Sequence, residues 1–128
     1  DSLPSRGLGD VYKRQYINLI TYKKDKTPIT TPVWVADFSN SLVVTTSLNA
    51  GKVKRVRNNG KATIYTTNQN GSKKLSESLD LKASLIEDAD IKKQAADIIR
   101  KKYGMMAKMI MKGPDKNRAI IKLEERRG

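Results

Sequence analysis

The chain of 128 residues contains no cysteine and no histidine. The lack of cysteine excludes a thiolate nucleophile, and the lack of histidine excludes a Ser-His-Asp triad and an imidazole general base. A zinc site built from cysteine and histidine is excluded as well, and we expect no metal centre. Any catalysis must therefore come from carboxylates, from lysine or from a bound cofactor.

Acidic residues are scarce: 13 Asp and Glu stand against 26 Lys and Arg, which gives a formal net charge of +13. A surplus of this size favours an anionic partner, which could be a nucleic acid, a phosphate-bearing cofactor or an acidic substrate. The sequence also has no uninterrupted apolar run long enough to span a bilayer. We therefore expect a soluble cytoplasmic protein that makes no membrane contact.

The first residues differ from the rest of the chain. Residues 5–15, SRGLGDVYKRQ, show no hydrophobic period. Written back into codons, they resemble the transposase adaptor that is used to build sequencing libraries. We therefore interpret residues 1–15 as a non-native, adaptor-derived scar and exclude them from fold reasoning. Residues 16–128 suit a single domain, whose native N-terminus we expect to be missing.

Six stretches have the composition or the alternation of β-strands. They are residues 16–22, 28–36, 42–46, 61–67, 74–87 and 118–123. Pro32 predicts an edge strand or a bulge. Leucines at even spacing, Leu75 among them, predict that 74–87 is one long, bent strand with one buried face. Short strands joined mostly by turns favour an α+β domain built on a small antiparallel barrel.

A short basic helix is predicted within residues 47–60, SLNAGKVKRVRNNG. Ser47 or Asn49 is the expected capping residue. Val53 and Val56 are three positions apart and form one apolar stripe.

A second helix is predicted from about Asp90 to Tyr103, followed by a glycine that ends it. Asp88 and Asp90 are interpreted as residues of the helix start and not as a catalytic pair. The expected core face consists of Ile91, Ala95, Ile98 and Ile99.

The stretches TTPVWV, LVVTT and AGKVKRVRNNGKATI, in this order, resemble the split-barrel superfamily typified by pyridoxamine 5′-phosphate oxidase. The nearer resemblance is to its small members that are deazaflavin-dependent oxidoreductases. It extends over nearly all of residues 16–124. The resemblance implies a six-stranded antiparallel split β-barrel of the FMN-binding kind, with flanking helices.

The resemblance also implies a cofactor site. In that superfamily the flavin lies in a groove between two subunits, so a homodimer is implied. One strand lines the ring and the ribityl chain, a second strand end approaches the phosphate, and a lysine at a helix start binds it. The matching positions are Thr31, Pro32, Val33 and Trp34 on the first strand, Thr45, Thr46 and Ser47 on the second, and Gly51, Lys52 and Arg55 at the helix. Three roles are open for Trp34: covering the ring, a dimer contact or core packing.

The implied function is that of an oxidoreductase that transfers hydride between FMN or a deazaflavin coenzyme and an unknown small organic substrate. The chemistry would be carried by the cofactor, so no catalytic side chain is assigned. Thr31 and Gly51 replace two arginines of the oxidases, and the histidine of their substrate pocket has no counterpart, so vitamin oxidation is not expected. The alternative is a non-catalytic flavin- or haem-binding protein. A basic nucleic-acid-binding module ranks lower, because no aromatic motif interleaves KVKRVRNNGK.

Overall fold

The computed structural model describes residues 16–38, 41–68, 72–75, 77–107 and 117–125, so the interpretation of residues 1–15 lies outside it. The elements in chain order are β1 (Ile17–Tyr22), β2 (Pro28–Val33), β3 (Val35–Phe38), β4 (Ser41–Ser47), α2 (Gly51–Asn58), β5 (Lys61–Thr66), β6 (Leu79–Leu85), α3 (Ala89–Tyr103), a short 3-10 turn (Gly104–Met106) and β7 (Arg118–Glu125).

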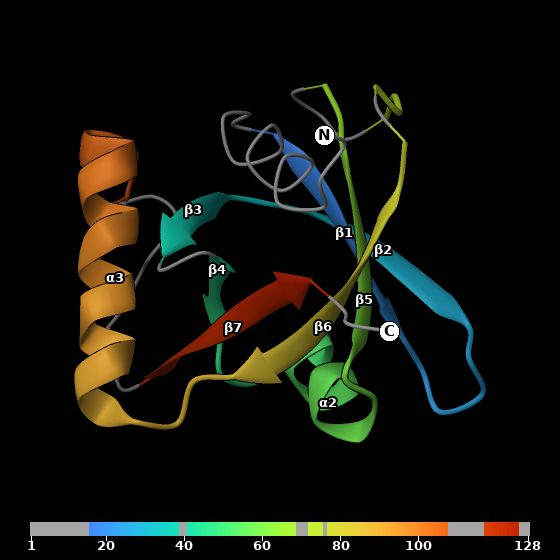
Figure 1. Ribbon diagram of the computed structural model, residues 1–128, viewed down its shortest axis with the longest axis horizontal. Helices are drawn as coiled ribbons and strands as arrows, with labels where there is room; N and C mark the ends of the chain where they lie inside the picture. Colours follow the sequence, from blue (N-terminus) through green and yellow to red (C-terminus); the bar gives the residue numbers. More distant parts are fainter. Residues whose placement is uncertain (1–15, 39–40, 69–71, 76, 108–116, 126–128) are drawn as a thin grey trace.

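The described strands form one sheet in the order β2-β1-β5-β6-β7-β4-β3, and every neighbouring pair is antiparallel. The edge strands β2 and β3 follow each other in the chain, with only Trp34 between them. The two edges must therefore approach each other, and the sheet curls into the open barrel seen in Figure 1. This confirms the predicted α+β class and the antiparallel split barrel.

The described residues form seven strands, whereas the sequence predicted six. The difference arises at Trp34, which leaves the ladder and divides the predicted 28–36 strand into β2 and β3. Pro32 lies in the edge strand β2, as predicted for a residue without a backbone N–H. After Trp34 the chain changes partner, because β2 pairs with β1 and β3 pairs with β4.

The predicted long strand at 74–87 is wrong in its extent, because among the described residues of this range the strand is Leu79–Leu85. Lys74 makes an isolated bridge to Thr67, and Leu75 is 53% exposed. The pairing of β6 with β5 ends at Ile64 and Leu79. Even spacing of leucines thus gave the right period but overestimated the strand, because the regular pairing with β5 is interrupted between Leu75, whose N–H donates to Thr66 O, and Leu79.

Two apolar clusters stabilise the domain. The first fills the barrel and includes Leu19, Ile64 and Leu123. The second lies between α3 and the outer side of the sheet, where α3 packs on β3, β4 and β7. Figure 1 shows α3 along this side and α2 below the opposite part of the barrel. None of the helices in the described residues is long and apolar enough to cross a membrane.

The core face of α3 differs in part from the prediction. Its buried residues are Ala95, Ala96, Ile99 and Tyr103, whereas Ile91 is 43% exposed. Ile91 lies in the first turn of the helix, and the buried residues begin one turn later, at Ala95. The predicted role of Asp88 is confirmed, because its side chain caps the helix by accepting from the backbone N–H groups of Asp90 and Ile91.

Candidate functional site

The short helix α2 positions two of the predicted phosphate-binding cations. Val53 and Val56 are buried, as predicted, and fix the helix against the sheet. Lys52 and Arg55 therefore lie on an adjacent, half-buried face. The expected cap at Ser47 or Asn49 is wrong: the N-cap is Ala50, in an extended conformation, and no described side chain caps the helix. The first turn of α2 is thus left without a side-chain acceptor for its N–H groups.

Lys52 and Arg55 reach two different strands of the barrel. The Lys52 Nζ donates to Thr46 Oγ1 on β4 at 3.4 Å. The Arg55 Nε donates to Thr21 Oγ1 on β1 at 2.6 Å. Since β1 and β4 are not neighbours in the sheet, α2 brings hydroxyl groups from separate strands around one pair of cations.

A third cation, Arg118, belongs to this group and was not predicted. Its Nε and Nη2 donate to Thr45 Oγ1 at 3.4 and 3.3 Å. Arg118 opens β7 and lies opposite Ser47 in the β4–β7 register. The sequence did predict both strands, but it gave no sign that the last strand pairs with LVVTT. The strand order is what brings Arg118 to the site.

The charges of this group repel one another. Burial lowers the pKa of Lys52 below its usual value, and the nearby positive charges of Arg55 and Arg118 lower it further. No carboxylate is among the causes of this shift. An anion placed between the three side chains would remove the repulsion and replace part of the lost hydration. We refer to Lys52, Arg55 and Arg118 as the cation cluster.

Gly51 makes room for the cation cluster. A Cβ at this position would lie 2.8 Å from Nη1 of Arg55, which is closer than such atoms approach. Any larger residue would have to displace the end of the Arg55 side chain. The guanidinium group of Arg55 therefore occupies space beside the helix start that is free only because residue 51 is glycine.

The predicted ring-lining strand forms a second group of residues. A cavity of about 300 Å³ is bordered by Tyr16, Ile17, Pro32, Val33, Trp34 and Met106. Trp34 also makes edge-to-face contacts with Tyr16 and Tyr103, at centroid distances of 5.9 and 4.8 Å. Core packing, one of the three roles left open for this residue, is thus observed, and Trp34 also borders this cavity. Covering the ring and a dimer contact stay predictions.

The packing of α3 fixes the position of Trp34. The hydroxyl group of Tyr103 donates to the backbone carbonyl of Val35, the residue after Trp34. The Lys102 Nζ donates to the same oxygen at 2.7 Å. Burial raises the pKa of Tyr103 to about 12, so the phenol remains a donor at neutral pH. These bonds hold the β2–β3 corner against the end of α3.

Strand β1 connects the two groups. Val33 lies opposite Ile17 and Thr31 lies opposite Leu19, so these β2 side chains share the face of β1 that also carries Thr21. Thr21 is the residue that accepts from Arg55. Among the described residues, Thr31 Oγ1 is buried and has no hydrogen-bond partner. A buried hydroxyl group without a partner is costly. The face of β1 beside Thr31 points into the barrel core, where Ile17 and Leu19 are fully buried.

The chain was compared with known proteins. The family model described as pyridoxamine 5′-phosphate oxidase matches residues 11–127. The match begins within residues 1–15, and the domain boundary expected at residue 16 stays a prediction. No curated protein sequence matches the chain.

Solved structures show the same fold. HutZ, a heme storage protein from Vibrio cholerae, has a TM-score of 0.72 and 15% identity, and the alignment covers 96% of this chain and 90% of that one. A Listeria innocua protein described as a candidate pyridoxamine 5′-phosphate oxidase has a TM-score of 0.70 and 18% identity, with 98% and 95% covered. An F420 reductase has a TM-score of 0.61 and 18% identity, with 94% of each chain covered. At these identities the likeness concerns the fold alone.

Proposed function

Since this chain belongs to the pyridoxamine 5′-phosphate oxidase family, we propose that it binds FMN or a deazaflavin coenzyme and acts as an oxidoreductase on a small organic substrate. The observation that carries this proposal is the cation cluster at the uncapped start of α2. Positive side chains from two elements, α2 and β7, lie near one another there, and the charges of Arg55 and Arg118 act on Lys52.

The cation cluster suits a phosphate group. Lys52 supplies a full charge, and Arg55 supplies a planar set of N–H donors. The start of α2 adds backbone N–H groups and the positive end of the helix dipole. Thr45, Thr46 and Ser47 lie at the end of β4 beside these donors and add hydroxyl groups. This is the chemistry that a phosphate monoester or diester requires, because the donors are in place before the ligand arrives.

The aromatic cavity beside Trp34 suits the ring of such a cofactor. Ile17 and Thr21 are roughly 13 Å apart along the extended strand β1, and the face of the strand that they share is buried in the barrel. Ile17 borders the aromatic cavity, and Thr21 touches the cation cluster. Thr31 lies opposite Leu19 in the strand register, and among the described residues its buried hydroxyl group has no hydrogen-bond partner. A bound flavin or deazaflavin would supply the hydride chemistry, while these residues hold and orient it and Trp34 and Val33 limit the access of water.

We also propose that the functional unit is a homodimer. The superfamily resemblance supports this, because its members close the cofactor groove with a second subunit. Light scattering of the cofactor-loaded protein tests the proposal, and a monomer that retains its flavin would contradict it.

The cofactor proposal is tested by reconstitution of the full chain. The protein is titrated separately with FMN, riboflavin and F420, and binding is followed by cofactor absorbance and fluorescence. We expect FMN or F420 to bind, and FMN to bind about tenfold or more tightly than riboflavin, because riboflavin lacks the phosphate. Substrate-dependent changes in the absorbance of the bound cofactor then test redox activity.

Three outcomes would argue against this function. If FMN and riboflavin bind equally, the cation cluster is not a phosphate site. A haem Soret band without flavin binding would favour the haem-binding alternative. Salt-sensitive binding of oligonucleotides without any cofactor would favour the nucleic-acid module.

A further inference from the structure

A second cavity of about 300 Å³ lies on the outer face of the barrel, where β1, β5 and β6 run side by side. Its lining includes Tyr22, Lys26, Asn59, Lys61, Thr63 and Asp80. Thr63 lies opposite Ile20 and Asp80 in the two strand registers. Because Ala62 and Ile64 beside it belong to the barrel core, Thr63 points away from that core. None of these residues belongs to the proposed cofactor groove.

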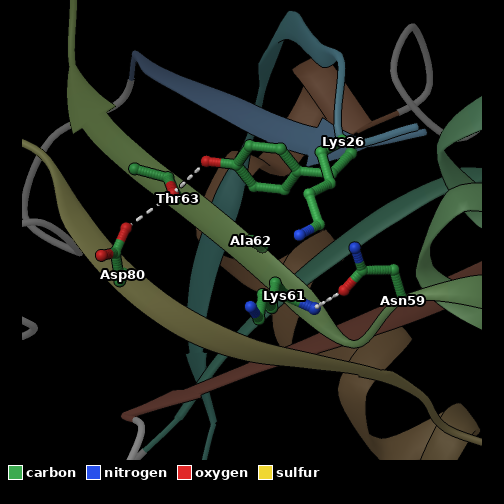
Figure 2. Close-up of a pocket in the computed structure, with 7 residues that line it drawn as sticks. Lys26, Asn59, Lys61, Ala62, Thr63 and Asp80 are labelled. Carbon is green, nitrogen blue, oxygen red and sulfur yellow. Dashed lines mark hydrogen bonds between the residues drawn. The ribbon is translucent and has the colours of Figure 1, made fainter. Parts of the chain in front are cut away.

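Hydrogen bonds orient the polar groups at the back of this cavity (Figure 2). The Thr63 hydroxyl group donates to Asp80 Oδ1 at 2.7 Å. Its single proton is thereby used, so in the contact of 2.7 Å between Tyr22 and Thr63 the phenol is the donor. The lone pairs of the Tyr22 oxygen and the Asp80 carboxylate are then acceptors for a ligand. Thr63 is only 6% exposed, so its hydroxyl group, which accepts from Tyr22 and donates to Asp80, is held in a fixed position.

Lys26 is held in an unusual backbone conformation at the mouth of the cavity. Its φ of 73° is in the left-handed region, which is unfavourable for a lysine. The β1–β2 turn enforces it through hydrogen bonds from Lys26 N to Lys23 O at 2.9 Å and from Lys23 N to Thr27 O at 3.0 Å. Figure 2 shows the Lys26 side chain directed into the cavity. Strain of this kind is found at ligand-binding positions more often than elsewhere.

Positive charge at the mouth and acceptors at the back make the cavity dipolar. Lys61 adds a second ammonium group, and its backbone N–H donates to Asn59 Oδ1 at 3.1 Å, which fixes the start of β5 at the rim. A carboxylate would be attracted by Lys26 and Lys61. A hydroxyl group on the same molecule could donate to Asp80 or to Tyr22. The volume is at the small end of known ligand pockets.

We propose that this cavity is a binding site for a small organic hydroxy acid. Its carboxylate contacts Lys26 and Lys61, and its hydroxyl group donates to the Asp80–Tyr22 side. The site differs from the cation cluster in one respect that matters for recognition. The cation cluster presents donors to a phosphate, whereas this cavity combines donors with a carboxylate acceptor, which disfavours a fully ionised phosphate.

Calorimetric titration of the full chain at constant ionic strength tests the proposal with three probes: L-malate, succinate and inorganic phosphate. We expect saturable binding of malate with a Kd of roughly 1 mM or below. Succinate, which lacks only the hydroxyl group, should bind several-fold more weakly, and phosphate should not compete. Lys26→Gly should weaken malate binding about tenfold, because it removes the ammonium group while glycine tolerates the left-handed backbone.

Matched variants separate this site from other basic surfaces. Lys24→Ala removes the same charge from an exposed position in the same turn and should change malate affinity less than about twofold. Asp80→Asn should bring malate affinity close to that of succinate. The proposal is overturned if malate does not saturate, if Lys24→Ala and Lys26→Gly cause equal losses, or if Lys52→Ala abolishes malate binding while Lys26→Gly leaves it unchanged.

Discussion

Helices α2 and α3 flank the same sheet but start in opposite ways. The first turn of α3 is capped by a side chain: Asp88 accepts from two backbone N–H groups at 2.9 and 3.1 Å, and Asp90 adds a negative charge. Its last turn carries basic residues that suit the helix dipole. The start of α2 has neither a side-chain cap nor an acidic residue. It has Lys52 instead, a positive charge at the positive end of the dipole.

The contrast is the one expected if α3 serves stability and α2, as proposed, meets an anionic ligand. α3 has four buried side chains and closes the second apolar cluster. α2 has eight residues and only two buried side chains, and its charges repel one another. An anion at the start of α2 would act as the missing cap. The variants below test this difference, beginning with the one of largest expected effect.

The largest effect is expected in α3, at Ile99. This side chain is fully buried, and Ile99→Ala should lower the free energy of unfolding by about 2–5 kcal/mol, because it removes buried atoms and leaves a cavity. Urea denaturation of the cofactor-free protein measures this change. Ile91→Ala on the exposed side of the same helix should cost less than about 1 kcal/mol. Equal losses would mean that α3 is not packed as described.

The second prediction concerns Lys52. A charge-assisted contact with phosphate contributes roughly 1.5–3 kcal/mol, so Lys52→Ala should weaken FMN or deazaflavin binding about ten- to a hundredfold. The fold should persist, because Lys52 lies off the face formed by the buried Val53 and Val56. Fluorescence titration measures affinity, and thermal melting of the cofactor-free protein checks the fold.

Two controls define what this result means. Lys54 is exposed on the same helix, and Lys54→Ala should cost little. Riboflavin binding should hardly change in Lys52→Ala, because the lost contact is to the phosphate. Equal losses for Lys52→Ala and Lys54→Ala that grow as salt is lowered would instead indicate a diffuse basic surface.

Much of the fold was predictable from local patterns. Alternation and β-branched residues indicated most of the strands, and the positions of Val53 and Val56 gave the correct inward face of α2. The break at Trp34 was not predictable, because both halves of that stretch have strand character. What divides them is the change of pairing partner, which depends on the whole sheet.

The candidate site, like the fold, was predictable where its residues are close in the sequence. Lys52 and Thr46 are close in sequence and were expected together, and they are in contact. Arg118 was missed because it is 73 positions from Thr45, the residue to which it donates. Local reasoning also expected a polar cap at Ser47 or Asn49, where the helix has Ala50. A helix start that binds a ligand, as proposed for α2, is expected to depart from the rules that stability alone would favour.

The third prediction exchanges the features of the two helix starts. Asp88→Ala should lower the free energy of unfolding by about 1 kcal/mol through loss of the cap. Ala50→Asp should raise the free energy of unfolding by adding a cap to α2, because Ala50 already has the extended backbone of a capping residue. The added carboxylate should also weaken FMN binding several-fold, since it occupies the place proposed for the anion. If Ala50→Asp leaves FMN affinity unchanged, the phosphate does not bind at this helix start.

The smallest expected effect is a dependence of cofactor affinity on pH. Burial and the neighbouring Arg55 and Arg118 lower the pKa of Lys52 below 10.5 in the cofactor-free protein. The folded state therefore binds fewer protons than the unfolded state in this range, so Lys52 makes stability rise with pH as it loses its proton. A bound phosphate favours the charged form, so cofactor binding takes up a proton and should weaken by a few-fold as the pH rises toward 10.5.

Lys52→Arg retains the charge at every pH, and FMN titrations across this range should show a flatter profile for it. The titration of the flavin itself is common to both proteins and cancels in the comparison. Parallel profiles would mean that Lys52 keeps its proton throughout and that the three cations are farther apart in solution than the structure places them.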